Sequence, residues 1–215
     1  TSPLHAGNAR GAVFGDALAS LLEVVGYKVI REYYINDAGS QIEKLVESSL
    51  IRYDECNGQN INEIPEGLYP GEYLKEVGKV LLKKYGKNLK QNSREDIFNL
   101  VREVSLEVIM KMIKEDLYKL GIEMDVFTSE HNIISGNLLT DILTILEEKN
   151  LTYYGSLDPP KGVDPTKWEK REQFLFKSTV YGDDSDRALK KSDGSWTYFA
   201  TDMAYHLDKI NRTNG

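Results

Sequence analysis

The stretch TSPLHAGNARG at residues 1–11 is the most informative part of the sequence, because it places a histidine and a glycine where a loop turns into a helix. Apolar residues then recur at steps of three and four, which predicts a helix over residues 9–25. A helix N-terminus presents free backbone N–H groups and a positive dipole end, and both attract phosphate. Gly7 lets a ligand approach the backbone, and His5 can donate a hydrogen bond to a phosphate oxygen. The opening stretch therefore predicts a nucleotide site.

A strand is predicted directly after this helix, over residues 27–35, where β-branched and aromatic residues alternate with others. A second helix is predicted over residues 38–53. Helix followed by strand after a glycine-bearing turn is the order of a βαβ unit in a parallel sheet, so the fold class is α/β. The first strand of that unit is expected before Thr1.

The rest of the chain alternates between helical periodicity and short apolar runs. Ser93 is a candidate N-cap for a long helix that runs to about Leu120 and ends at Gly121. Asp193 and Gly194 form a hairpin turn signal. The other predicted elements are helices over residues 72–84, 137–149 and 200–211, a loop over 61–70, and strands over 151–155, 174–181, 188–191 and 196–199.

This order of elements predicts three parts along the chain. Residues 1–54 are expected to form the first half of a nucleotide-binding catalytic fold. Residues 55–190 are expected to form an insertion that is mostly helical with short strands. Residues 191–215 are expected to return to the catalytic fold.

The composition excludes several classes of protein. The 34 acidic residues outnumber the 27 Lys and Arg residues, and a net charge of −7 argues against the chain as a whole being a nucleic-acid clamp. Cys56 is the single cysteine, so neither a disulfide within the chain nor a cysteine-based zinc site can form. A lone cysteine fits a reducing cytoplasm. The sequence contains no apolar run of about 18 residues, so no membrane span is expected.

Four further stretches carry a specific resemblance. They are REYYINDAGSQ at residues 31–41, DVFTSE at 125–130, GDD at 182–184 and SDGSWTYFATDMAYH at 192–206. Together with the opening stretch they resemble, in the right order, the arginyl-tRNA synthetases among the class I synthetases. That family's first signature is His-x-Gly-His, and here its last position is Asn8. The resemblance implies an incomplete Rossmann-like (class I synthetase) nucleotide-binding fold with a largely helical insertion.

The resemblance also implies a reaction. ATP, accompanied by Mg²⁺, would activate L-arginine to arginyl-adenylate, and the arginine would then pass to tRNA(Arg). The full-length enzyme would be monomeric and cytoplasmic. His5 and Asn8 would be catalytic, and the predicted ligand contacts are His5, Gly7 and Asn8 to ATP, and Glu130, Tyr198 and Asp202 to the guanidinium of arginine. No protein ligand for a metal is identified.

Several of these residues have a plainer interpretation from sequence. Asn8 either caps the helix or donates to the nucleotide. Asp202 near a helix start is also explained as a partner of the helix dipole. The acidic run at residues 183–186 is expected to be a solvated loop rather than a metal site. Three further polar residues have the composition of a turn when the sequence is taken alone. The resemblance places them beside the active site: Asn36, Asp37 and Gln41.

The sequence is expected to be a fragment. It does not begin with methionine, and the lysine-rich second signature of class I synthetases does not occur in it. The fragment alone is therefore expected to be inactive. Two other functions remain open from sequence: a nucleotidyltransferase for small acids, and a truncated, non-catalytic synthetase paralogue that acts as a binding module.

Overall fold

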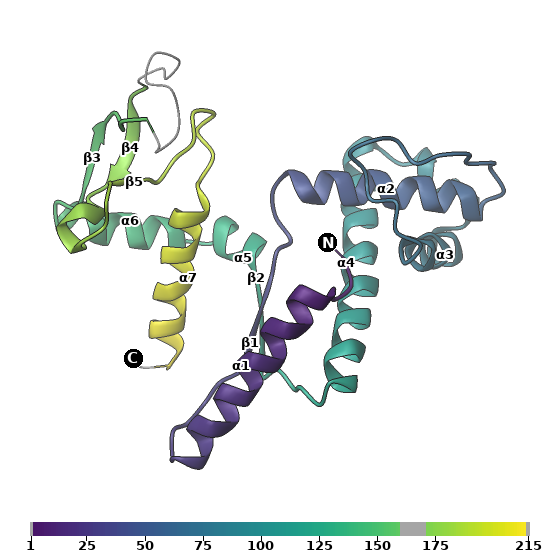
Figure 1. Cartoon of the computed structure of the whole chain (residues 1–215). Coiled ribbons are helices and arrows are strands. Elements are labelled where there is room, and N and C mark those ends of the chain that lie inside the picture. Colours follow the sequence, from purple (N-terminus) through teal and green to yellow (C-terminus); the bar gives the residue numbers. More distant parts are fainter. Residues whose placement is uncertain (1, 160–170, 214–215) are drawn as a thin grey trace. The chain divides into compact units, whose positions relative to one another are not determined.

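A computed structural model describes residues 2–159 and 171–213 of the chain. The chain divides into two compact units, Thr1–Ser129 and Glu130–Gly215 (Figure 1). The predicted three-part division at residues 54 and 190 concerns the catalytic fold and its insertion, and it stays a prediction.

The first unit is mainly helical. Its elements are α1 (Ala6–Val24), β1 (Glu32–Ile35), α2 (Ser40–Cys56), α3 (Leu74–Tyr85), a 3₁₀ turn (Gly86–Gln91), α4 (Arg94–Lys119) and β2 (Val126–Ser129). The predicted cap of α4 is confirmed, because the Ser93 hydroxyl accepts from the Asp96 amide at 3.1 Å. Gly121, at φ 75°, follows the end of that helix as predicted.

The two strands of this unit pair in parallel, with Glu32 opposite Val126 and Ile35 opposite Ser129. A parallel pair needs a long crossover, and here α2, α3 and α4 supply it. The predicted α/β class is confirmed. The strand predicted over residues 27–35 is too long, because only four of its residues have a ladder partner in β2. Strand β2 has no counterpart among the strands predicted from the sequence.

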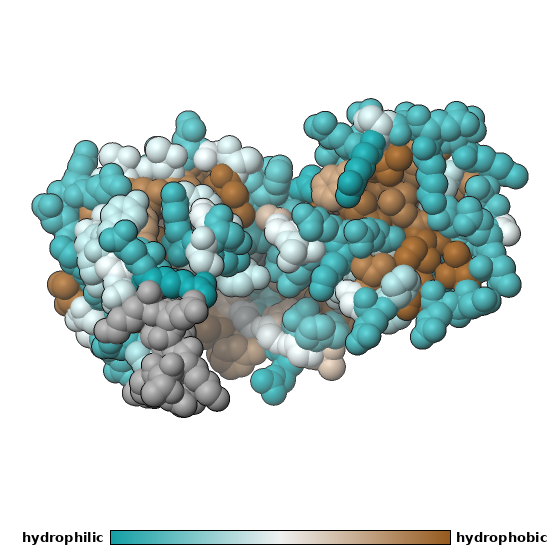
Figure 2. Space-filling view, turned by 90° about the horizontal axis from the view of Figure 1, so that it is seen from above, coloured by the Kyte–Doolittle hydropathy of each residue, from teal (hydrophilic) through white to brown (hydrophobic). Residues whose placement is uncertain are grey.

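The core of the first unit lies between α2, α3 and α4. Leu45, Leu74, Val77 and Leu81 are fully buried there. Gly78 allows α2 and α3 to approach closely, since a Cβ at this position would lie 2.5 Å from the carbonyl oxygen of Arg52. Seen from above, apolar side chains gather between polar ones over this helical part (Figure 2).

The second unit combines helices with a small antiparallel sheet. Its elements are α5 (Glu130–Ser135), α6 (Leu138–Glu148), β3 (Thr152–Gly155), β4 (Gln173–Phe176), a 3₁₀ turn (Ser178–Tyr181), β5 (Arg187–Ala188) and α7 (Tyr198–Thr213). The strands pair in the order β3-β4-β5. The strand predicted over 174–181 stops at Phe176, because the chain turns into the 3₁₀ segment at Ser178.

The strand predicted over residues 196–199 is wrong. Only Trp196 makes a β-bridge there, to Lys190, and α7 begins at Tyr198. The physical reason is Thr197, whose hydroxyl donates to the Ala188 carbonyl and accepts from the Ala200 amide in the manner of an N-cap. The predicted turn before it is confirmed, since Gly194 has φ 82°.

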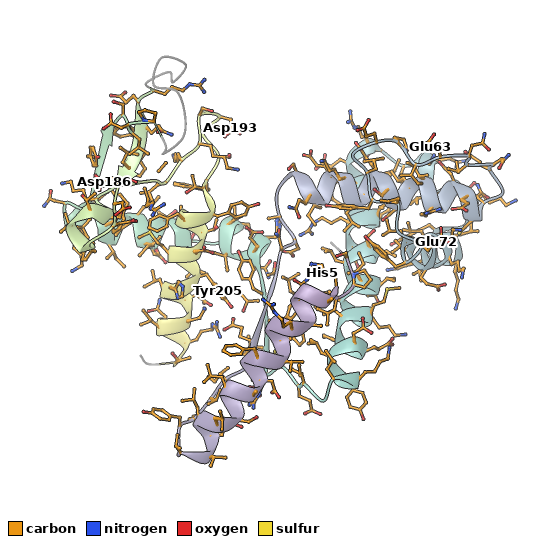
Figure 3. The ribbon with its side chains drawn as sticks, in the orientation of Figure 1. His5, Glu63, Glu72, Asp186, Asp193 and Tyr205 are labelled. Carbon is orange, nitrogen blue, oxygen red and sulfur yellow. The ribbon has the colours of Figure 1, made fainter. Side chains whose placement is uncertain are left out.

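The acidic run at residues 183–186 is a loop open to solvent, with Asp184 exposed, and hydrogen bonds hold its two ends. Asp186 accepts hydrogen bonds from the Thr179 amide, the Thr179 hydroxyl and the Tyr153 hydroxyl, at 2.7–3.0 Å. The Thr179 amide is the main reason why the pKa of Asp186 lies below its usual value. Asp183 pairs with Arg187. The run therefore joins the 3₁₀ turn to the sheet (Figure 3).

Candidate active site

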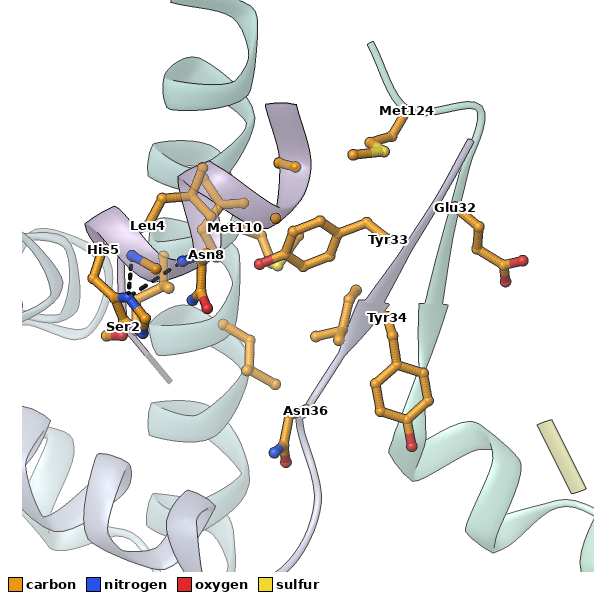
Figure 4. A pocket seen from close by; sticks show the side chains of 17 residues that line it. Ser2, Leu4, His5, Asn8, Glu32, Tyr33, Tyr34, Asn36, Met110 and Met124 are labelled. Carbon is orange, nitrogen blue, oxygen red and sulfur yellow. Dashed lines mark hydrogen bonds between the residues drawn. The ribbon is translucent and has the colours of Figure 1, made fainter. Parts of the chain in front are cut away.

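His5 is fixed by its own helix. It is the N-cap of α1, and its Nδ1 accepts from the Gly7 amide at 3.1 Å and the Asn8 amide at 3.3 Å (Figure 4). Because a neutral imidazole that accepts at one nitrogen carries its proton on the other, the remaining Nε2–H is a donor. The fold thus holds the His5 ring in one orientation before any ligand arrives.

Gly7 makes this arrangement possible. A Cβ on Gly7 would lie 3.1 Å from Cε1 and 3.2 Å from Nδ1 of the His5 ring, so a larger residue would push the ring away. The Gly7 amide, predicted as a phosphate donor, is engaged by His5 in this structure. The value of Gly7 here is the space that it leaves for the imidazole.

The interpretation of Asn8 as the helix cap is wrong. Asn8 is the third residue of α1, and the capping position belongs to His5. The helix begins three residues earlier than predicted because the His5 side chain satisfies two amides of the first turn. The Asn8 side chain is therefore not needed for capping.

A cavity of about 660 Å³ opens beside this helix start. His5, Gly7 and Asn8 line it from α1, and Asn36 lines it from the end of β1 (Figure 4). Apolar side chains of α4 supply another wall: Leu106, Ile109, Met110 and Ile113. Tyr33 also lines the cavity, and its burial raises the pKa of its phenol. A concave site with a few polar groups over an apolar wall is typical of small-molecule binding.

The predicted neighbours of the site fall into three different places. Asn36 lines the cavity. Asp37 is 7% exposed and accepts from the Ser129 hydroxyl. Gln41 is exposed on α2 and is not among the residues that line the cavity. The places of Tyr33 in the cavity wall and of Ser129 beside Asp37 were not predicted from the sequence. The β-branched and aromatic residues at 126–128 were the available signal for β2, which ends at Ser129.

The three residues predicted to hold arginine all lie in the second unit. Glu130 is the first residue of α5 and is 5% exposed, and α5 packs against α7. Tyr198 is the first residue of α7, and Asp202 follows four residues later, which places both on one face of the helix. Tyr198 is 65% exposed and Asp202 is exposed. The start of α7 therefore presents a phenol and a carboxylate to solvent.

The possible metal ligands of residues 2–159 and 171–213 are dispersed. In that part of the chain, no group of three or more His, Cys, Asp or Glu side chains is placed to hold a metal ion. Within the same two ranges, none of the helices combines the length and the apolar character of a membrane span.

The sequence matches the profile of the family described as tRNA synthetases class I (R), catalytic domain, over residues 1–214. The chain belongs to this family. An arginine–tRNA ligase of Ehrlichia chaffeensis is 58% identical over 212 residues, which are 99% of this chain and 37% of that protein. The arginine–tRNA ligase of Parvibaculum lavamentivorans is 55% identical over 99% of the chain and 36% of its own length. The chain thus spans a little over a third of the length of these relatives.

A solved structure shares the fold. It is that of a Campylobacter jejuni protein described as an arginyl-tRNA synthetase, 35% identical, with a TM-score of 0.78 over 99% of this chain and 43% of that one. The class I synthetase fold expected from the sequence is therefore confirmed.

Proposed function

We propose that the full-length protein containing this chain is an arginine–tRNA ligase, which uses ATP to join L-arginine to tRNA(Arg). The observation that carries the proposal is the His5 ring, which is oriented by two backbone amides at the rim of a cavity of about 660 Å³. Family membership supports it. We place the enzyme in the cytoplasm and expect a monomer.

In the first step, a carboxylate oxygen of arginine attacks the α-phosphorus of ATP. The bond to the bridging oxygen breaks, and pyrophosphate leaves with the electron pair. Negative charge grows on the transferring phosphate, and preorganised donors stabilise it. His5 contributes Nε2–H, and the Asn8 side-chain amide, freed from capping, is the second donor. A hydroxyl of the terminal adenosine of the tRNA then attacks the arginyl carbonyl, and AMP leaves.

Mg²⁺ would accompany ATP and would neutralise phosphate charge. Among residues 2–159 and 171–213, no group of three or more His, Cys, Asp or Glu side chains is placed to hold it.

Arginine needs a pocket of opposite charge, because its guanidinium stays protonated and presents five donors in a plane. Glu130 and Asp202 supply carboxylates, and Tyr198 supplies a flat ring and a hydroxyl. Their placement at the starts of α5 and α7, which pack together, supports this assignment. A nucleotidyltransferase for small acids would have no use for this set.

The first experiment removes the imidazole. In the full-length protein, His5→Ala should slow arginine-dependent ATP–pyrophosphate exchange by about 10²–10³-fold, since one oxyanion-type donor has this effect. The affinity for arginine should change little. His5→Asn is the matched control, because asparagine restores an N-cap without the imidazole. An exchange rate in His5→Ala equal to that of the unmodified protein would leave His5 with a capping role alone.

The second experiment tests the amino acid. Asp202 is exposed, and a bound guanidinium would desolvate its carboxylate. Asp202→Asn keeps the shape and removes the charge, so it should weaken the binding of arginine by about 2 kcal/mol, roughly 30-fold in Kd. ATP affinity should stay the same. Asp208→Asn, which removes a carboxylate of α7 paired with Arg212, is the control. Calorimetric titration of each ligand decides the matter. Unchanged arginine affinity in Asp202→Asn would remove Asp202 from the pocket.

A further inference from the structure

Asp37 joins the ends of the two parallel strands. It lies in the loop after β1 and is 7% exposed. The hydroxyl of Ser129, the last residue of β2, lies 3.0 Å from one of its carboxylate oxygens and 2.8 Å from the other. Ser129 is also the ladder partner of Ile35, so the side-chain contact lies just beyond the last backbone pair.

A third element reaches the same carboxylate. The Arg102 guanidinium, from α4, lies 3.5 Å from a carboxylate oxygen of Asp37 and 3.3 Å from its carbonyl oxygen. A buried carboxylate is stable only where charge and hydrogen bonds compensate it, and here both come from outside its own loop. Asp37 therefore links β1, β2 and α4.

This link lies at the edge of the sheet where ligands bind in open α/β folds, beyond the carboxyl ends of the strands. Asn36, directly before Asp37, lines the cavity and is exposed (Figure 4). Asp37 is not itself among the cavity-lining residues. Its burial fixes the backbone from which the Asn36 side chain projects.

We propose that Asp37 is a positioning residue: by joining Ser129 and Arg102 it holds Asn36 in the orientation in which that side chain meets the substrates of activation. The proposal rests on the proposed function. It assigns Asp37 no contact with substrate, and it distinguishes Asp37 from Asn36, which does the binding.

The test uses the full-length protein and ATP–pyrophosphate exchange, with the active fraction measured by titration of bound adenylate. Asp37→Asn keeps the shape and an acceptor for Ser129 but removes the charge that faces Arg102. Ser129→Ala removes the donor and leaves the charge. Both should raise the KM for ATP, for arginine or for both by about tenfold, since a misplacement of about 1 Å can cost up to about 10²-fold. Ser129→Thr, which keeps the hydroxyl, should have KM values close to those of the unmodified protein.

Two comparisons separate positioning from a merely structural role. Asp54→Asn removes another buried carboxylate, paired with Lys90 on the helical side of the unit, and should leave both KM values unchanged. Asn36→Ala combined with Asp37→Asn should cost no more in kcat/KM than the larger single change, because both act through one side chain. The proposal would be overturned if Asp37→Asn and Ser129→Ala left both KM values unchanged and lowered only the active fraction. It would also be overturned if the losses of kcat/KM in Asn36→Ala and Asp37→Asn added up in the double variant. Absence of arginine-dependent exchange in the unmodified protein would instead overturn the proposed function.

Discussion

Helices α1 and α2 lie on either side of β1 in the sequence and have similar lengths, 19 and 17 residues. They differ in how many of their side chains are buried. Helix α1 buries one residue, Ala19, whereas α2 buries eight. On α1 large apolar side chains stay exposed, among them Phe14 at 71% and Val24 at 85%. Helix α1, which follows His5, therefore buries much less apolar surface than α2.

Polar contacts take the place of that core. The Arg31 cluster consists of Arg31 and its partners on α1, which are Asp16, Ser20 and Glu23. The Arg31 guanidinium lies 2.8 Å from Asp16 and 2.7 Å from Glu23, and its backbone N–H donates to Asp125. Ion pairs that stay open to solvent contribute little each, whereas fully buried leucines contribute much. Of these two helices, α2 therefore carries buried core, whereas α1 follows His5 and is held mainly by polar contacts.

The largest expected effect is on α2. Leu45→Ala removes a fully buried side chain from the core between α2, α3 and α4, and should lower the stability of this region by about 2–5 kcal/mol. Hydrogen exchange of α2 amides in the full-length protein measures the loss. Leu45→Met, which nearly conserves volume, should cost less than about 1.5 kcal/mol. Leu45 is not among the residues that line the cavity, so both KM values should remain unchanged in the folded fraction. A tenfold rise in either KM would show that the core of α2 also shapes the site.

The sequence predicted α1, α2 and α4 because helical periodicity and caps are local signals. Ser93 and Gly121 mark the two ends of α4 within a few residues of the ends themselves. The same signals failed at α7: Trp196 to Phe199 is an aromatic and β-branched run typical of strands, and the Thr197 hydroxyl overrides it.

Strand β2 and the role of Asp37 were beyond sequence reasoning for a different reason. Both depend on contacts between residues about 90 positions apart in the chain, from Glu32 opposite Val126 to Asp37 beside Ser129. No periodicity records such a pairing. At the site, His5 was predicted from its place at a helix start, but its own capping of that helix depends on a ring orientation that the sequence does not specify.

The smallest expected effect is on α1, at the Arg31 cluster. Arg31→Lys replaces a planar fork by a point charge, which cannot contact Asp16, Ser20 and Glu23 together. The rate of exchange of α1 amides should then rise by less than about fivefold, because these ion pairs are partly open to solvent, while the rate for α2 amides is unaffected. Lys111→Ala, which breaks an exposed pair with Glu115 on α4, is the control and should leave α1 unchanged.

The pH dependence of this small effect follows from Glu23. Its hydrogen bonds with Arg31 lower the pKa of its carboxyl below the usual 4.5 in the folded protein. A lowered folded pKa means that the stabilisation is complete above pH 4.5 and is lost as pH falls through the folded value. The difference between Arg31→Lys and the unmodified protein should therefore shrink below about pH 4.5. If the difference is instead constant down to the acid limit of folding, Glu23 contributes nothing to the Arg31 cluster, and Asp16 and Ser20 are its working partners.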